Sequence, residues 1–76
     1  MSTQALISAV HYRRDYPGHD EGVVLVWQGE AYGWKNELRD PQSERPGVYA
    51  VDADGNVWEA VGGNDYDGAE RWEAMQ

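Results

Sequence analysis

The sequence predicts an α+β fold, with a small antiparallel β-sheet of about four strands, arranged as two hairpins, and an N-terminal helix. Two runs of β-branched and aromatic residues, 23–35 and 47–61, are each interrupted by a glycine-containing turn, which is typical of hairpins. A third stretch, residues 3–14, has apolar residues at helical spacing. With 76 residues, the chain is expected to form a single small domain over 1–76.

The N-terminal stretch, residues 3–14, fits either of two structures. Leu6, Ala9 and Val10 recur at the spacing of one helix face, but residues 7–12 also have the composition of a strand. The glutamine, alanine, leucine and arginine residues of this stretch have high helix propensity. We therefore expect a helix, with a strand as the alternative.

Residues 23–35, VVLVWQGEAYGWK, are expected to form the first hairpin, which turns around Gln28-Gly29-Glu30. Side chains alternate between the two faces of a strand. With either Gln28-Gly29 or Gly29-Glu30 at the centre of the turn, the same residues share one face: Val23, Leu25, Trp27, Tyr32 and Trp34. Gly33, inside a strand, indicates a bulge or a close approach by another backbone.

Residues 36–46, NELRDPQSERP, form a polar connector with two prolines. A residue that precedes proline is pushed towards an extended conformation, so any helix here is limited to about one turn. We expect a solvated loop.

The second hairpin, Gly47–Val61, is expected to close on Asp54-Gly55, because a type I′ turn needs positive φ at both central residues. This register places an uncharged set on one face, which we take as the core face: Tyr49, Val51, Trp58 and Ala60. Beyond it, Gly62–Asp65 is expected to be a loop. Residues 69–75 fit a short C-terminal helix or an edge strand.

The net charge of −8 is unevenly distributed. Residues 1–38 carry five acids and three bases, for −2, and residues 39–76 carry nine acids and three bases, for −6. Binding to a nucleic-acid backbone needs Lys and Arg on the phosphates, so we expect no direct nucleic-acid binding. An acidic field favours a protein partner with a basic surface.

Several functional classes are not predicted. With no cysteine, the chain has neither disulfides nor thiolate chemistry. It contains no G-x-S-x-G elbow and no phosphate-binding glycine loop, so we predict no catalytic residue, no cofactor and no enzyme. Asp52–Asn56 suggests a calcium loop but lacks the glycine and glutamate that such a loop needs further on, so no metal site is predicted. Without a long apolar run or a signal-peptide pattern, we expect a cytoplasmic protein that does not bind membranes.

Two blocks carry a resemblance to known proteins. They are GVVLVWQGEAYGWKNELRDP (Gly22–Pro41) and RPGVYAVDADGNVWEAVGGNDYDGAERWE (Arg45–Glu73). They resemble short acidic proteins carried by conjugative plasmids and integrative elements of Proteobacteria, sometimes labelled antirestriction. The resemblance includes no motif with an assigned chemical role. It implies a mobile-element accessory protein that blunts a host defence. Small acidic inhibitors of restriction or CRISPR machinery often imitate the charge of DNA, a mode that fits the net charge of −8.

The leading functional hypothesis is therefore a small acidic binding protein that acts on a basic protein surface. Its candidate residues are the carboxylates of the C-terminal half: Asp52, Asp54, Glu59, Asp65, Asp67, Glu70 and Glu73. An alternative is a binding module in which Trp27, Tyr32 and Trp34 form an aromatic groove for a peptide or small ligand, since such rings are enriched at binding hot spots. A third hypothesis is a structural homodimer, because a domain this small gains stability by association.

Overall fold

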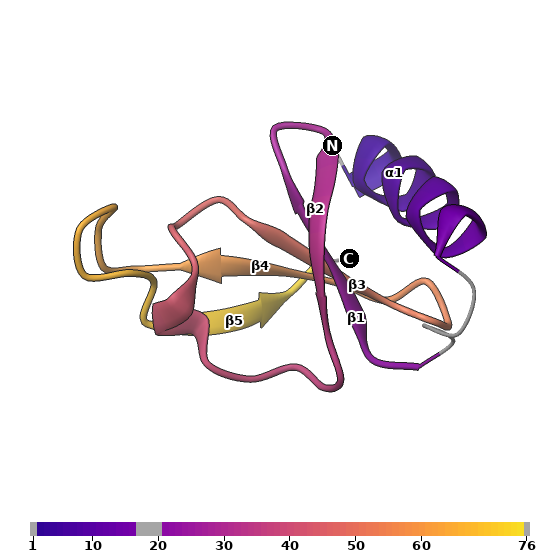
Figure 1. The fold of residues 1–76 in the computed structure, drawn as a ribbon. Helices are drawn as coiled ribbons and strands as arrows, with labels where there is room; N and C mark the ends of the chain where they lie inside the picture. The colour runs from indigo at the N-terminus through magenta and orange to yellow at the C-terminus, as the bar shows by residue number, and fades with distance from the viewer. Residues whose placement is uncertain (1, 17–20, 76) are drawn as a thin grey trace.

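The computed structural model describes residues 2–16 and 21–75 and contains one helix on a five-stranded antiparallel sheet (Figure 1). The strand order is β2-β1-β3-β4-β5. In chain order the elements are α1 (Ser2–Asp15), β1 (Val23–Trp27), β2 (Glu30–Lys35), the 3₁₀ turn η1 (Pro41–Ser43), β3 (Tyr49–Asp52), β4 (Val57–Val61) and β5 (Arg71–Ala74). The α+β prediction is confirmed. The sheet has one strand more than two hairpins supply, because β5 joins β4 at the edge.

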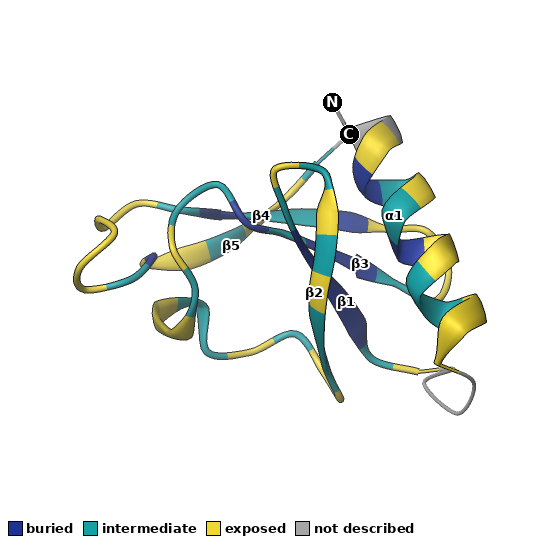
Figure 2. Cartoon of the chain, turned by 45° about the horizontal axis from the view of Figure 1, so that its top comes forward, coloured by how far each residue is buried: buried dark blue, intermediate teal, exposed yellow. Residues whose placement is uncertain are grey.

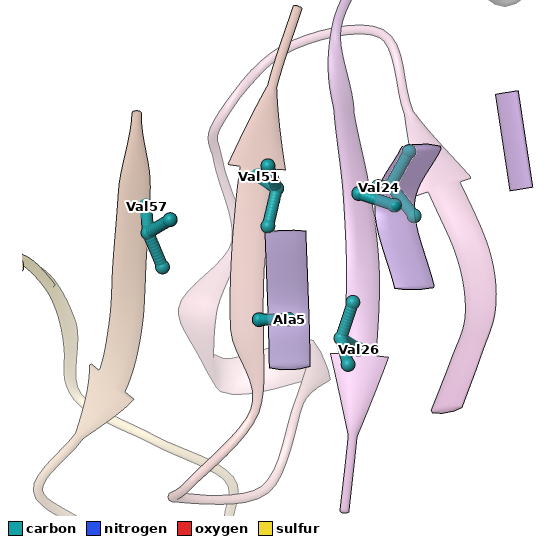
Figure 3. Close-up of a cluster of buried hydrophobic side chains, with 6 residues drawn as sticks. Ala5, Val24, Val26, Val51 and Val57 are labelled. Carbon is teal, nitrogen blue, oxygen red and sulfur yellow. The ribbon is translucent and has the colours of Figure 1, made fainter. Parts of the chain in front are cut away.

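The N-terminal stretch is a helix, and small residues seat it on the sheet. Ala5 and Ala9, each 2% exposed, pack on a cluster that includes Val24, Val26 and Val51 (Figure 3). The helix is buried on the side that faces the sheet and exposed on its outer side (Figure 2). Alanine side chains let the helix backbone approach the strands closely, and their high helix propensity explains why the strand alternative is not adopted.

The first hairpin has the tight turn and the bulge that the sequence indicates, and the predicted shared face is correct for Val23, Leu25 and Trp27 but wrong for Trp34. Gln28 and Gly29 both have positive φ, 52° and 84°, as a type I′ turn requires. Val26 pairs with Ala31 and Leu25 pairs with Gly33, so Tyr32 is the extra residue of a β-bulge. Beyond this bulge every side chain changes face, which places Trp34 opposite Val24, on the α1 side of the sheet.

The second hairpin is offset by one residue from the predicted register. Val51 pairs with Val57 and Ala50 pairs with Trp58, around a three-residue loop instead of a two-residue type I′ turn. Tyr49 and Val51 consequently lie on the α1 side of the sheet, whereas Trp58 and Ala60 lie on the other side. A slip of one residue moves a strand's side chains to the opposite face, so the predicted core face is wrong.

Asp52 supplies the physical reason for the wider turn. Its carboxylate accepts hydrogen bonds from the backbone N–H groups of Asp54 (2.9 Å) and Asn56 (2.8 Å) and from the Asn56 side chain (3.0 Å). Gly55 has the expected positive φ, 89°, and its N–H donates to the Asp52 carbonyl. A type I turn followed by a left-handed glycine is the usual three-residue hairpin loop.

The Asp52 cap should make stability depend on pH. Partial desolvation raises the pKa of Asp52, but the hydrogen bonds from Asn56 and from the turn backbone outweigh it and lower the pKa. A lowered folded-state pKa adds stability above the unfolded value of ~3.9, and this is lost as pH falls through the folded value. Asp52→Asn should therefore cost about 1 kcal/mol or less at pH 7, since solvent screens the group, and nothing in strong acid.

Urea denaturation of the two proteins at neutral and acidic pH measures this difference. Asp54→Asn, at the exposed tip of the same turn, is the matched control and should be neutral or slightly stabilising at pH 7 in so acidic a chain. A deficit of Asp52→Asn that stays constant down to strong acid would contradict the assignment of the cap to the ionised carboxylate.

The connector and the C-terminal segment cover the second face of the sheet, which accounts for apolar residues on both sides of the strands. The buried residues there are Val23, Leu25, Val48, Ala50, Ala60 and Ala69. Leu38 and Trp72 pack against them, and the Trp72 indole N–H donates to the Arg39 carbonyl at 3.2 Å. The expected solvated loop over 36–46 is exposed or half-buried throughout, but Leu38 packs on this face and the Glu44 side chain is shielded. Of the two alternatives for 69–75, the edge strand is the one that forms.

Candidate functional site

The most developed surface feature lies around β2, at one edge of the sheet. Two hollows flank this strand, and Glu30, Ala31 and Tyr32 line both of them. One, of about 400 Å³, lies on the connector side, and the other, of about 630 Å³, lies between α1 and β2. We call them the connector-side hollow and the helix-side hollow, and together the β2-edge site.

The connector-side hollow combines aromatic rings with charges of both signs. Its lining comprises Trp27, Glu30, Ala31, Tyr32, Ser43, Glu44, Arg45 and Val48. The Arg45 guanidinium lies over the Trp27 ring, 4.9 Å from its centroid, which is a cation–π contact. The Tyr32 hydroxyl donates a hydrogen bond to the Glu44 carboxylate. Partial burial, together with this bond and the charge of Glu44, raises the pKa of Tyr32 above its usual range.

Glu44 holds this wall of the hollow in place. Its carboxylate lies 3.2 Å from the Lys35 ammonium, and the two side chains are only 10% and 14% exposed. The ammonium also donates to the carbonyls of Arg39 (3.1 Å) and Asp40 (3.2 Å). The backbone carbonyl of Glu44 accepts from the Ala69 N–H at 2.8 Å, so this residue joins β2, the connector and the C-terminal segment.

The helix-side hollow follows one face of α1. Its helix residues lie three or four positions apart, on one side of the helix: Gln4, Ser8, His11, Tyr12 and Asp15. Tyr16, just after the helix, also lines it. The Ser8 hydroxyl and the Gln4 amide (3.5 Å) donate to the Gly29 carbonyl, which fixes the start of the helix against the β1–β2 turn. Near its end, Arg13 donates to the Gly22 carbonyl at 3.1 Å. The helix therefore runs lengthwise along the hairpin.

The three aromatic residues singled out in the sequence do not form one groove. Trp27 and Tyr32 line the connector-side hollow. Trp34 packs on the opposite face, with the α1 cluster, and its indole N–H donates to the Glu21 carbonyl at 2.6 Å. The bulge at Tyr32 separates them, because it reverses the side on which the following side chains lie.

The predicted acidic residues fall in three places. Asp52 and Asp54 lie in the β3–β4 turn, whereas Asp65 and Asp67 lie in the β4–β5 loop at the other end of the sheet (Figure 1). Of the remaining three, Glu59 is on β4, Glu73 is on β5 and Glu70 lies just before β5. Glu59 pairs with Glu73 across the two strands. Arg71 bridges Glu73 (2.8 Å) and Glu70 (3.7 Å). The acidic residues that line the β2-edge site, Asp15, Glu30 and Glu44, are different ones.

Sequence reasoning missed Glu44 and Arg45 because they lie in a polar connector without periodicity. Nothing in the local pattern distinguishes a shielded ion-pairing glutamate from a solvated one.

Among residues 2–16 and 21–75, no group of three or more His, Cys, Asp or Glu side chains is placed to hold a metal ion. In the same part of the chain, α1 is too short and too polar to cross a membrane.

Comparison with protein-family models, with curated proteins and with solved structures found no match to this chain.

Proposed function

We propose that this chain is a non-enzymatic binding protein that captures a positively charged segment of a protein partner at the β2-edge site. The observation that carries the proposal is the composition of the connector-side hollow, where Trp27 and Tyr32 lie beside the exposed Glu30 carboxylate. An aromatic face and a carboxylate both attract guanidinium and ammonium groups. Arg45 already occupies the Trp27 face as an internal cation at 4.9 Å, which supports the use of this ring for cation binding.

The charge of the whole chain supports the same partner. A net charge of −8 attracts a basic protein over a Debye length of ~10 Å at 0.1 M salt and so raises the association rate. The hollow then supplies the short-range contacts that a diffuse field cannot. The predicted acidic residues at the two ends of the sheet would add to this field without forming the binding site.

An inhibitor of a host defence nuclease is one protein of this kind. Its target would present the Lys and Arg residues that normally hold DNA phosphates. The resemblance to mobile-element proteins makes such nucleases the first class of partner to test. In that case DNA and this protein should compete for the same surface of the nuclease.

A titration with hexa-arginine, followed by the NMR signal of the Trp27 indole N–H, tests the proposal. We expect Glu30→Lys to weaken binding about tenfold, because it places a cation between the two hollows. Asp65→Lys changes the net charge equally but lies in the β4–β5 loop, so it should weaken binding less than about threefold, through the long-range field alone.

High salt provides the second readout. Binding should weaken strongly between about 0.1 M and about 1 M NaCl, where the Debye length falls from ~10 Å to ~3 Å. A Trp27 signal that does not respond to the peptide, or equal effects of the two charge reversals, would show that the hollow is not the cation site.

A further inference from the structure

We infer that the partner segment binds in extended form, as a sixth strand added to β2 in the groove between α1 and this strand. The inference rests on the proposed function, because it concerns the same β2-edge site. It adds the conformation of the ligand, the side from which it enters and the alternation of its side chains. Strand addition to an exposed sheet edge is a general mode of peptide recognition, in which main-chain hydrogen bonds supply affinity and flanking pockets supply specificity.

The first support is the position of β2. It is a terminal strand of the sheet, and among the described residues it pairs with β1 alone. Its outer edge can therefore accept another strand. The bulge at Tyr32 lies on this edge strand, and bulges are over-represented at sheet edges and beside binding sites.

The second support is the groove beside that edge. Because α1 begins beside Gly29 and ends beside Gly22, it runs along the whole hairpin. Its lining residues on α1 extend from Gln4 to Asp15, about 17 Å at a rise of ~1.5 Å per residue. At ~3.3 Å per residue, that length accommodates about five residues of an extended peptide, and the hairpin wall of the groove is formed by residues 29–32, the turn and the first half of β2.

The third support is the pair of hollows on opposite faces of the same strand. Successive side chains of an added strand point alternately to the two faces. One set would enter the helix-side hollow and the other would face the side of Tyr32, Glu44 and the connector-side hollow. Glu30 and Tyr32 line both hollows and would contact both sets.

Charge defines the chemistry of the occupant. Asp15 and Glu30 line the helix-side hollow, and its described lining residues include no Lys or Arg. The hydroxyls of Ser8, Tyr12 and Tyr16 add further polar groups at this wall. The occupant is therefore an extended peptide with Lys or Arg at alternate positions directed towards α1, and a further Lys or Arg of the same segment, beyond the added strand, occupies the connector-side hollow.

Backbone methylation of a probe peptide tests this mode. The probe is a blocked nonapeptide that alternates lysine and valine, and two further peptides carry N-methyl groups on the lysines or on the valines only. In an antiparallel or parallel ladder, only alternate N–H groups of the added strand point to β2. We expect one methylated peptide to bind at least tenfold more weakly and the other to bind within about threefold of the parent.

Hydrogen exchange of the β2 amides gives an independent readout. Outward amides that pair with the peptide should exchange at least about tenfold more slowly. If the Trp27 indole responds to the probe but both methylated peptides bind like the parent, strand addition is wrong and the proposed cation-binding function stands. If the Trp27 indole does not respond to any peptide, both fail.

A pair of charge reversals locates the peptide on the helix side. Asp15→Lys should weaken binding of the lysine–valine peptide at least about fivefold, and it should fold normally because a lysine is favourable at the end of a helix. Asp65→Lys carries the same change in net charge at the far end of the sheet and should weaken binding less than about twofold. Equal effects of the two variants would place the peptide elsewhere.

Discussion

Replacing Gly68 by alanine is expected to remove more than half of the stability of the fold. Gly68 has a φ of 89°, and a Cβ atom built on it would lie 2.0 Å from the backbone carbonyl oxygen of Gln42. The left-handed conformation alone costs on the order of 1–3 kcal/mol for a residue other than glycine. The clash adds to this, because its partner is backbone in η1 and cannot rotate away. We expect a total loss of at least about 3 kcal/mol.

A loss of this size is severe in a small domain, whose whole stability is of the order of 5 kcal/mol. Thermal denaturation followed by circular dichroism should show a melting temperature lower by roughly 15 °C or more. Gly33→Ala is the matched control, because its Cβ atom would meet only the Leu25 side chain at 3.8 Å, an ordinary contact. Similar melting temperatures for the two variants would mean that the C-terminal loop does not pack on η1 in solution.

The position of Gly68 also illustrates what local sequence patterns can and cannot predict. Hairpins, turns and the helix depend on neighbouring residues, so their presence could be predicted from propensity and alternation. The packing of Gly68 on Gln42 joins segments whose approach depends on the whole chain. The sequence marks such a glycine only as a loop residue.

Register is the second limit. The alternation of Tyr49, Val51, Trp58 and Ala60 is compatible with two-residue and three-residue turns, which place opposite sets on the core face. The hydrogen bonds of the Asp52 carboxylate to Asp54 and Asn56 favour the longer turn. Both faces of the sheet are covered, so apolar residues are buried on either side. The apolar pattern alone therefore does not decide between the two registers.

The candidate site was only partly predictable for a related reason. Trp27 and Tyr32 could be selected from the sequence as aromatic anchors. The side of the sheet on which Trp34 lies depends on the bulge at Tyr32, which the sequence does not place. Glu44 and Arg45 enter the site through the path of the connector. The Lys35–Glu44 ion pair depends on how the connector folds back on β2, and the order of charges along the chain does not predict that path.

Glu44→Ala is expected to destabilise the fold by about 2–4 kcal/mol, a loss comparable to that of Gly68→Ala. The Glu44 carboxylate neutralises the shielded Lys35 ammonium at 3.2 Å and accepts the Tyr32 hydroxyl. Its removal leaves that ammonium with the carbonyls of Arg39 and Asp40, which carry no full charge. Urea denaturation at pH 7 measures the loss.

Glu70→Ala is the control for the removal of one carboxylate. Glu70 is paired with Arg71 at 3.7 Å, but both side chains are more than half exposed, at 68% and 58%. Exposed pairs of this kind contribute about 0–1 kcal/mol, so this variant should stay close to the parent protein. A titration of the Tyr32 ring by NMR adds a local readout. In Glu44→Ala its pKa should fall back towards the usual ~10, although partial burial keeps it somewhat higher.

The double variant Lys35→Met with Glu44→Leu separates the cost of an unpaired charge from the value of the pair. If Glu44→Ala destabilises the fold because it strands a shielded ammonium, removing both charges together should restore most of the loss. Replacing a shielded ion pair with apolar residues of similar volume is often neutral or stabilising, so we expect the double variant to lie within about 1 kcal/mol of the parent. A double variant as unstable as Glu44→Ala would instead assign the loss to the Tyr32 hydrogen bond and to the packing of the connector on β2.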